Sequence, residues 1–311
     1  MINLLNNKVL VLGKSGQVAK SLYKLKYNAK FDIKFLDRNQ IDLDSDIYRK
    51  LSIYISELDP KFIVNAAAYT AVEKAEKNIQ SAMQINGYSV GTIAKLCSEF
   101  EIPLLHFSTD YVFGDDGSDF LCPLVKKNPT GIYGKSKLLG EDLIKNYVNK
   151  NSLKAIILRI SWVFSENGNN FVNTIIKLSN SKDEIKIIND QFGGPTSSDS
   201  VALATISIIN NYLDNLSSNN SQNIPWGEYH FQGQPIVSWY EFACFIINKA
   251  EKLGLITKSP NIKSISSNEY NFSIKRQLNS RLSMELSKSK LGLNPSDWKK
   301  DLINCLKSKI K

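Results

Sequence analysis

Short runs of nearly continuous apolar residues recur along the first half of this chain, and segments with helical spacing separate them. Such runs are typical of strands that are buried on both faces of a sheet. Because strands alternate with helices, the pattern predicts a parallel, doubly wound α/β sheet with helices on both sides. The expected strands are Lys8–Leu12, Phe31–Leu36, Phe62–Asn65, Leu104–Phe107 and Ala155–Ile160, with a long helix over Ile79–Glu101.

The alternation weakens after residue 165, where turn-rich segments and shorter apolar runs follow. We therefore expect residues 1–165 to form one domain and residues 166–311 to form mainly a second, smaller α/β domain. Residues 196–215 are expected to pack back on the first domain, and the polar residues 214–225 to form a mobile loop. The other expected elements are strands at Ile185–Ile188 and Tyr229–Gln232 and helices at Ser200–Leu213, Trp239–Leu253 and from Asp297.

A turn of small residues, Gly13-x-x-Gly16-x-x-Ala19, follows the first strand and leads into a helix. Small residues allow a pyrophosphate to approach the backbone, and the helix N-terminus favours its negative charge. This arrangement predicts a Rossmann-like domain that binds a dinucleotide. At the end of the second strand, Asp37 suits the 2′-hydroxyl of NAD, whereas Arg38 suits the 2′-phosphate of NADP. The sequence therefore leaves NADPH and NADH both open as the cofactor.

Small residues also end the third strand, at Asn65-Ala-Ala-Ala-Tyr69, as expected where a backbone lies against a cofactor. The cofactor site is therefore expected to draw on the first three strand ends and on a later Tyr-x-x-x-Lys pair. The residues expected to contact the cofactor are Gly13, Ser15, Gly16, Gln17, Val18, Asp37, Arg38, Asp42, Ala66, Ala67, Tyr69, Tyr133 and Lys137.

The Tyr-x-x-x-Lys pair consists of Tyr133 and Lys137, downstream of Thr109. On a helix, the two side chains lie one turn apart on the same face. A nearby ammonium favours the phenolate and lowers the pKa of the phenol toward the working pH. We expect Tyr133 to donate a proton to a carbonyl oxygen while hydride reaches the carbon, and Thr109 to hold that oxygen. Thr109, Tyr133 and Lys137 are the predicted catalytic residues.

The composition argues against several other classes of protein. The formal net charge is +9, but the lysines are spread along the chain and interleaved with acidic residues, unlike a nucleic-acid-binding surface. No apolar run is long enough to span a bilayer, so we expect no membrane segment or signal peptide. The four cysteines lack a C-x-x-C spacing, and the two histidines lack a second ligand at a metal spacing. We therefore expect no metal site and a reducing, cytoplasmic location.

Segments along nearly the whole chain resemble dTDP-4-dehydrorhamnose reductases, which are extended short-chain dehydrogenase/reductases. The resemblance implies a Rossmann-like domain followed by a smaller C-terminal substrate-binding domain. It also implies reduction of the 4-keto group of dTDP-4-dehydro-β-L-rhamnose with NADPH or NADH, the last step of dTDP-rhamnose biosynthesis for cell-surface polysaccharide such as O antigen. The most specific matching segments are Ser108-Thr-Asp-Tyr-Val-Phe113, Gly168-Asn-Asn-Phe171, Asp190-Gln-Phe-Gly-Gly-Pro-Thr196 and Asn279-Ser-Arg-Leu282.

The same resemblance implies which residues hold the nucleotide-sugar substrate. Asp110 and Trp162 fall at positions implicated in holding the sugar nucleotide, and the positive charge of Arg281 suits its diphosphate. The residues expected to bind substrate are Thr109, Asp110, Trp162, Asn170 and Arg281.

The chain departs from the family pattern at three places, none of which is a catalytic position. Ala19 replaces the third glycine of the turn, Gly114-Asp-Asp-Gly117 replaces an Asp-Gly pair, and Arg276-Gln-Leu278 replaces the more usual Arg-Pro. Some family members form a metal-bridged dimer through glutamates. We find no match for those glutamates, so no metal is expected, while a homodimer stays open.

Three other functions were weighed against reduction of dTDP-4-dehydro-β-L-rhamnose. Related 4,6-dehydratases carry Thr-Asp-Glu and use the Glu for elimination, whereas Tyr111 occupies that position here, so simple reduction is favoured. Reduction of another nucleotide-linked 4-keto sugar stays open. So does a non-catalytic, NADP-binding regulatory subunit, because a branch of the family serves as such a subunit of methionine adenosyltransferase.

Overall fold

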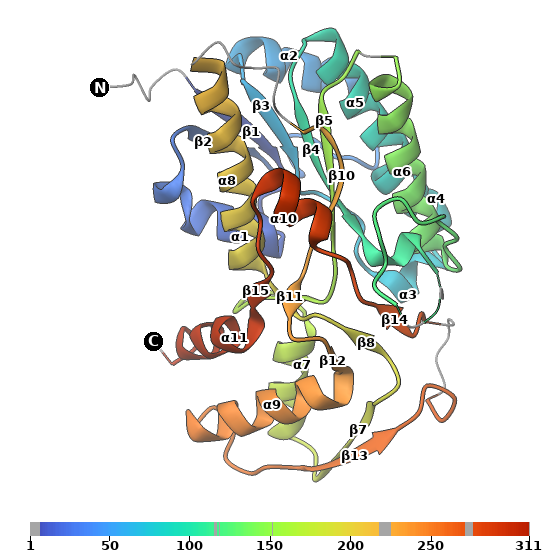
Figure 1. Cartoon of the computed structure of the whole chain (residues 1–311), viewed down its shortest axis with the longest axis vertical. Coiled ribbons are helices and arrows are strands. Elements are labelled where there is room, and N and C mark those ends of the chain that lie inside the picture. Colours follow the sequence, from blue (N-terminus) through green and yellow to red (C-terminus); the bar gives the residue numbers. More distant parts are fainter. Residues whose placement is uncertain are drawn as a thin grey trace.

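A six-stranded parallel sheet forms the centre of the computed structural model, with the strand order β10-β5-β4-β3-β1-β2 (Figure 1). The structure describes residues 7–114, 117, 119–150, 152–217, 225–270 and 276–310. The five strands predicted in the first half of the chain are all present, and the predicted doubly wound fold is confirmed. The sheet contains β1 (Lys8–Leu12), β2 (Asp32–Leu36), β3 (Phe62–Asn65), β4 (Leu104–Thr109), β5 (Ala155–Ile160) and β10 (Gly227–Phe231).

Helices cover both faces of the sheet because successive strand residues point to opposite sides. Val9 and Val11 of β1 pack in one apolar cluster with α1 (Gln17–Lys24) and α8 (Ser198–Ser217). Leu10 and Leu12 pack in a second cluster on the opposite face. The helices of this second face are α2 (Tyr48–Leu58), α5 (Ser89–Glu99) and α6 (Ile132–Val148).

The long helix predicted over Ile79–Glu101 is interrupted by one π-helical turn. It consists of α4 (Ile79–Met83), the π-turn η3 (Gln84–Tyr88) and α5. The buried Asn86 of the π-turn bonds through its amide to Tyr69, and it also donates to the Ser136 hydroxyl of α6 at 3.0 Å. The extra residue therefore turns a polar side chain inward between the end of β3 and α6.

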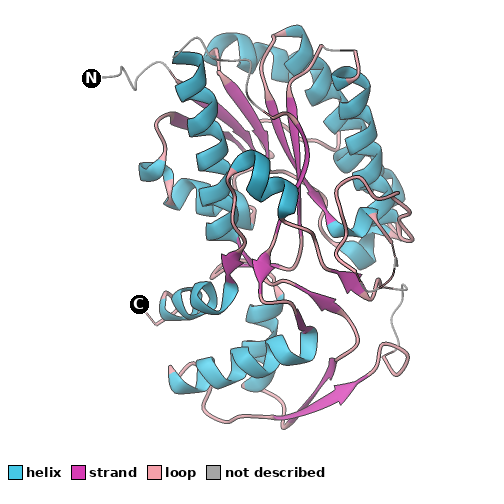
Figure 2. Cartoon of the chain, in the orientation of Figure 1, coloured by secondary structure: helices cyan, strands magenta, loops and turns pink. Residues whose placement is uncertain are grey.

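The second layer lies below the sheet in Figure 1 and packs around its own apolar cluster. Its strand pairs are short, and only β7 with β13 extends over five residues. Figure 2 shows that, apart from β7 and β13, these strands are shorter than those of the central sheet. The elements of this layer are β6 (Val163–Phe164), α7 (Phe171–Ser179), β7 (Glu184–Ile188), β8 (Phe192–Gly193), β9 (Thr196–Ser197), β11 (Gly233–Gln234), β12 (Val237–Ser238), α9 (Trp239–Lys252), β13 (Asn261–Ile265), β14 (Asn279–Ser280), β15 (Ser296–Asp297) and α11 (Trp298–Lys307).

Several segments after residue 165 return to the central sheet. α8 packs against α1, β10 extends the sheet beside β5, and α10 (Glu285–Leu291) contacts β10. The predicted loop over residues 214–225 begins too early, because α8 continues through Ser217. Residues 218–224 of that prediction lie outside the described residues. The division of the chain into domains at residue 165 stays a prediction.

The remaining short elements connect the sheet to its helices. They are η2 (Lys26–Asn28), α3 (Val72–Ala75) and η4 (Asp110–Val112). Among these, η4 matters most for function because it follows directly on Thr109, the last residue of β4.

Candidate active site

The turn between β1 and α1 requires glycine at its first position. Gly13 has a φ of +96°, and a Cβ there would lie 3.1 Å from the backbone nitrogen of Ala67. Its N–H donates to the carbonyl oxygen of Leu36 at 2.8 Å, which ties the turn to β2. The backbone of this turn therefore lies directly against the residues that follow β3.

The start of α1 suits an anion. Gly16 is the N-cap of α1, and no side chain caps the helix there. A Cβ on Gly16 would meet only the carbonyl oxygen of Ala66, at 3.8 Å, so the protein leaves room above this residue. Uncapped N–H groups at a helix N-terminus favour a phosphate, and these residues therefore fit the pyrophosphate of a dinucleotide.

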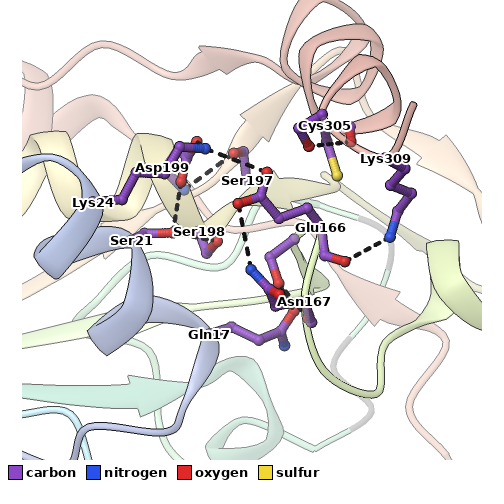
Figure 3. Close-up of polar contacts among 12 residues, drawn as sticks. Gln17, Ser21, Lys24, Glu166, Asn167, Ser197, Ser198, Asp199, Cys305 and Lys309 are labelled. Carbon is purple, nitrogen blue, oxygen red and sulfur yellow. Dashed lines mark hydrogen bonds and ion pairs between the residues drawn. The ribbon is translucent and has the colours of Figure 1, made fainter. Parts of the chain in front are cut away.

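A cavity of about 760 Å³ opens beside this turn. Four residues of the predicted cofactor set line it: Ser15, Gln17, Asp37 and Arg38. Its far wall comes from the start of α8 and from α11, where Ser21 and Lys24 of α1 bond to Asp199 at 2.6 and 2.8 Å (Figure 3). The cavity is large enough for part of a dinucleotide.

Asp37 and Arg38 are both engaged within their own loop. Asp37 Oδ1 accepts the backbone N–H groups of Asn39 and Gln40 at 2.9 and 3.2 Å. Arg38 Nε donates to Asp42 Oδ1 at 3.2 Å, and its side chain is 72% exposed. The Arg38 guanidinium is exposed and the carboxylate of the adjacent Asp37 is half-buried, so the 2′-hydroxyl and the 2′-phosphate both stay acceptable.

Gln17 and Asn170 connect the cofactor turn to the second layer. Gln17 Oε1 accepts bonds from Ser165 Oγ at 2.7 Å and from Asn170 Nδ2 at 2.9 Å. Asn170 also caps α7, because its Oδ1 accepts the N–H of Asn173 at 3.1 Å. Although Asn170 was predicted to bind substrate, the structure places it beside Gln17 and at a helix terminus.

The predicted proton donor lies where β4 meets α6. Tyr133 is in the first turn of α6, and its ring meets that of Tyr111 edge-on at 5.5 Å. Burial raises the pKa of Tyr133, the negative charge of Asp110 raises it further, and a hydrogen bond with Thr109 lowers it. The phenol therefore keeps its proton at neutral pH, as a proton donor to an alkoxide must. It lies beside Thr109, which was predicted to hold the oxygen that receives this proton.

Lys137 lies one turn beyond Tyr133, but its amine points toward β4. Its Nζ donates to the carbonyl oxygen of Phe107 at 2.6 Å and lies 3.2 Å from Nε2 of His106. Burial lowers the pKa of Lys137 to about 8, against an opposing effect of Glu141. From the sequence, Lys137 was expected to lower the pKa of Tyr133. In the structure, this pKa is affected by burial and by the neighbouring Thr109, Asp110 and Tyr111.

Asp110 is buried directly after β4, and its carboxylate accepts hydrogen bonds from neutral side chains. Thr109 Oγ1 donates to its Oδ1 at 2.9 Å, and Gln277 Nε2 donates to its Oδ2 at 2.6 Å. Burial raises the pKa of Asp110 to about 6, although its hydrogen bonds with Ser280, Thr109 and Gln277 lower it. Sequence reasoning noted Gln277 only as a departure from the family pattern and did not assign it to the site.

Trp162 and Arg281 both meet strand β8. Trp162 has a φ of +48° and stacks on Trp239, with ring centroids 3.4 Å apart and planes 10° apart. A Cβ on Gly193 would lie 2.7 Å from Cε2 of Trp162, so glycine makes room for the indole. The Arg281 guanidinium lies 4.6 Å from the ring centroid of Phe192. The two predicted substrate-binding residues thus border one short strand.

The described part of the chain contains no helix that is long and apolar enough to cross a membrane. Within the same residues, no group of three or more His, Cys, Asp or Glu side chains could hold a metal ion.

Hydride transfer from a nicotinamide needs a dinucleotide-binding sheet edge and a proton donor beside it, and this chain places both at the C-terminal ends of its parallel strands. These features define an oxidoreductase of the short-chain dehydrogenase type. A family model described as the RmlD substrate binding domain matches residues 7–310, and the chain belongs to this family.

Relatives agree along nearly the full length. The dTDP-4-dehydrorhamnose reductase of Aggregatibacter actinomycetemcomitans is 35% identical over 299 residues, which cover 96% of this chain and 97% of that protein. The Escherichia coli K12 protein of the same name is 32% identical over 292 residues, 93% of this chain and 94% of its own. The solved structure of Bacillus anthracis dTDP-4-dehydrorhamnose reductase in complex with NADP has a TM-score of 0.83 and 28% identity, covering 97% and 99% of the two chains.

Proposed function

We propose that this protein reduces the C4 keto group of dTDP-4-dehydro-β-L-rhamnose to give dTDP-L-rhamnose, with NADPH or NADH as reductant. The activity named for its relatives supports this proposal. The observation that carries it is the grouping of Tyr133, Thr109 and the buried Asp110 at the end of β4. This reaction would supply the activated deoxysugar for cell-surface polysaccharide.

The cofactor is proposed to lie along the C-terminal edge of β1, β2 and β3. Gly13, Gly16 and the first turn of α1 would hold its pyrophosphate, and Asp37 or Arg38 its adenosine ribose. Ser15, Gln17, Val18, Asp42, Ala66, Ala67, Tyr69, Tyr133 and Lys137 complete the proposed contacts. When bound, the reduced nicotinamide supplies the hydride.

The chain's own residues would manage the proton and the substrate. Thr109 would donate a hydrogen bond to the C4 oxygen, and Tyr133 would transfer its phenolic proton to that oxygen as negative charge develops. Asp110, Trp162 and Arg281 would orient the sugar nucleotide, and the Arg281 guanidinium would pair with a diphosphate oxygen. Asn170 would bind the substrate from its position beside Gln17.

Simple reduction fits this site better than elimination. Elimination at C5 and C6 needs an acid–base group that exchanges protons near neutral pH. Tyr111 occupies the corresponding position, and burial together with the charge of Asp110 raises its pKa to about 12. A phenol with so high a pKa does not serve as a base at neutral pH.

The test is oxidation of NADPH and of NADH by the purified protein in the presence of dTDP-4-dehydro-β-L-rhamnose. Tyr133→Phe should lose at least about 100-fold in kcat while it retains dinucleotide binding, because only the proton donor is removed. Near wild-type turnover by this variant would disprove the assignment. Tight NADPH binding by the wild type without any turnover would instead favour another keto sugar or a regulatory subunit.

A homodimer, a cytoplasmic location and a separate substrate-binding domain over residues 166–311 are further proposals. Sedimentation equilibrium of the purified chain tests the first of them. Cell fractionation tests the second.

A further inference from the structure

Four polar groups form a buried line from the end of β3 to α6. The N–H of Ala67 donates to Asn65 Oδ1 at 3.2 Å, and Asn65 Nδ2 lies 3.1 Å from His106 Nδ1. His106 Nε2 in turn lies 3.2 Å from Lys137 Nζ. Asn65, His106 and Lys137 are at most 2% exposed, so water does not compete for these contacts.

The direction of each hydrogen bond follows from the first one. A backbone N–H can only donate, so the oxygen of the Asn65 amide must face Ala67 and its NH2 group must face His106. Nδ1 of His106 must then accept. Burial holds the pKa of His106 well below its ordinary value, so the imidazole is neutral. A neutral imidazole that accepts at Nδ1 carries its proton on Nε2.

This proton faces Lys137. An ammonium has three donors and no acceptor, so Nε2–H and an ammonium would oppose each other at 3.2 Å. A neutral amine has a lone pair that accepts the Nε2 proton. One of its own hydrogens then donates to the carbonyl oxygen of Phe107 at 2.6 Å. All of these donors and acceptors are matched only when Lys137 is a neutral amine.

We propose that His106 is a positioning residue that donates from Nε2 to the neutral amine of Lys137 and thereby favours release of the lysine's proton. The inference rests on the proposed role of Lys137 at the active site. Asn65 fixes the tautomer of His106, and His106 sets the protonation state of Lys137. Lys137 therefore loses its proton at a lower pH than an exposed lysine does.

Charged groups around Lys137 agree with this assignment. Burial lowers its pKa to about 8, and Glu141, one turn further along α6, opposes this effect. The Glu141 carboxylate is already bound by the Arg159 guanidinium at 2.8 and 2.6 Å, so its attraction for a proton on Lys137 is reduced. From β4, the titratable group that faces Lys137 is His106 itself.

The tautomer can be measured directly on the wild-type protein by nitrogen NMR with 15N-labelled histidine. The chain has only two histidines, and His230→Gln assigns their signals. We expect His106 to carry its proton on Nε2 and to stay neutral from pH 6 to pH 9, a range in which Lys137 is expected to titrate. A proton on Nδ1 would overturn the proposal, because Nε2 would then accept from an ammonium.

The pH dependence of kcat provides the functional readout. In His106→Gln, the side-chain amide can turn its oxygen toward an ammonium, so the apparent pKa near 8 should rise by about one unit or more. His230→Gln makes the same change in the other buried histidine and should leave that pKa in place. An unmoved pKa in folded His106→Gln would show that His106 is only structural.

These measurements separate the two proposals. If Tyr133→Phe kept its activity, the proposed proton donor would be wrong, yet the tautomer of His106 would still be decided by NMR. If His106→Gln failed to fold, the wild-type tautomer would decide alone.

Discussion

The ion pair between Arg159 and Glu141 gives the sharpest prediction for stability. Arg159 on β5 and Glu141 on α6 are both fully buried, and they form two parallel hydrogen bonds of 2.8 and 2.6 Å. Arg159 also contacts Glu228 of β10, which has a second partner in Lys127 at 2.9 Å. Replacing Arg159 by methionine therefore leaves Glu141 as the carboxylate that loses its neutralising partner.

Breaking a buried pair by removing one partner costs about 3–5 kcal/mol, because an uncompensated charge stays in the interior. For 311 residues, an unfolding entropy of about 2.1 cal/mol/K per residue means that each kcal/mol lowers Tm by about 1.5 °C, so Arg159→Met should melt roughly 5–8 °C below the wild type. The double variant Arg159→Met/Glu141→Leu removes both charges and should recover about half of this loss or more.

The free energies of unfolding come from urea denaturation followed by circular dichroism, in a double-mutant cycle. Lys258→Met is the matched control, since its pair with Asp183 has side chains that are 73% and 88% exposed and should not measurably change the free energy of unfolding. If the double variant lost as much stability as the two single variants together, the two charges would not be coupled and the reasoning would fail.

Three other predictions concern the site. Burial raises the pKa of Asp110 to about 6, above its unfolded value, so its favourable contribution is complete below pH 4 and is lost as pH rises through 6. Asp110→Asn should therefore remove roughly 2–3 kcal/mol of pH dependence from urea melts between pH 4 and 7. A Cβ at Gly134 would overlap the carbonyl oxygen of Tyr111, so Gly134→Ala should cost about 1–3 kcal/mol in denaturant titrations and displace Tyr133 enough to lower kcat. Gly13→Ala should weaken NADPH binding by roughly 10-fold or more in calorimetry, whereas Gly254→Ala, which also has a positive φ (+70°) but lies in open space, should not.

The sequence predicts the central fold well because local signals determine it. β1, β3 and β5 match the predicted apolar runs residue for residue, and α1 follows the glycine turn as predicted. The π-turn could not be predicted, since it depends on the contacts that Asn86 makes with Tyr69 and Ser136. The pairing of β10 with β5 likewise depends on tertiary contacts, which the residue pattern of a single strand does not reveal.

In the site, too, some residues could be predicted from local sequence and others could not. Thr109 and Tyr133 could be predicted to meet, because the ends of parallel strands lie at one edge of a sheet. His106 was considered only as a possible metal ligand and was not assigned to the site. Its register opposite Asn65 on the neighbouring strand was the signal that could have placed it in the site. Gln277 comes from a distant segment, and nothing in its local sequence indicates that it bonds to Asp110.

The position of β10 in the sheet has a consequence for synthesis on the ribosome. β5 ends at Ile160, and its neighbour β10 begins at Gly227. The outer edge of β5 therefore stays unpaired until roughly 70 more residues have been synthesised. At about 5–20 residues per second, that edge stays unpaired for roughly 4–14 s. An open strand edge is a template for unwanted pairing between nascent chains. Slow translation between these two strands would therefore be expected to lower the yield of folded protein more than slow translation after Phe231.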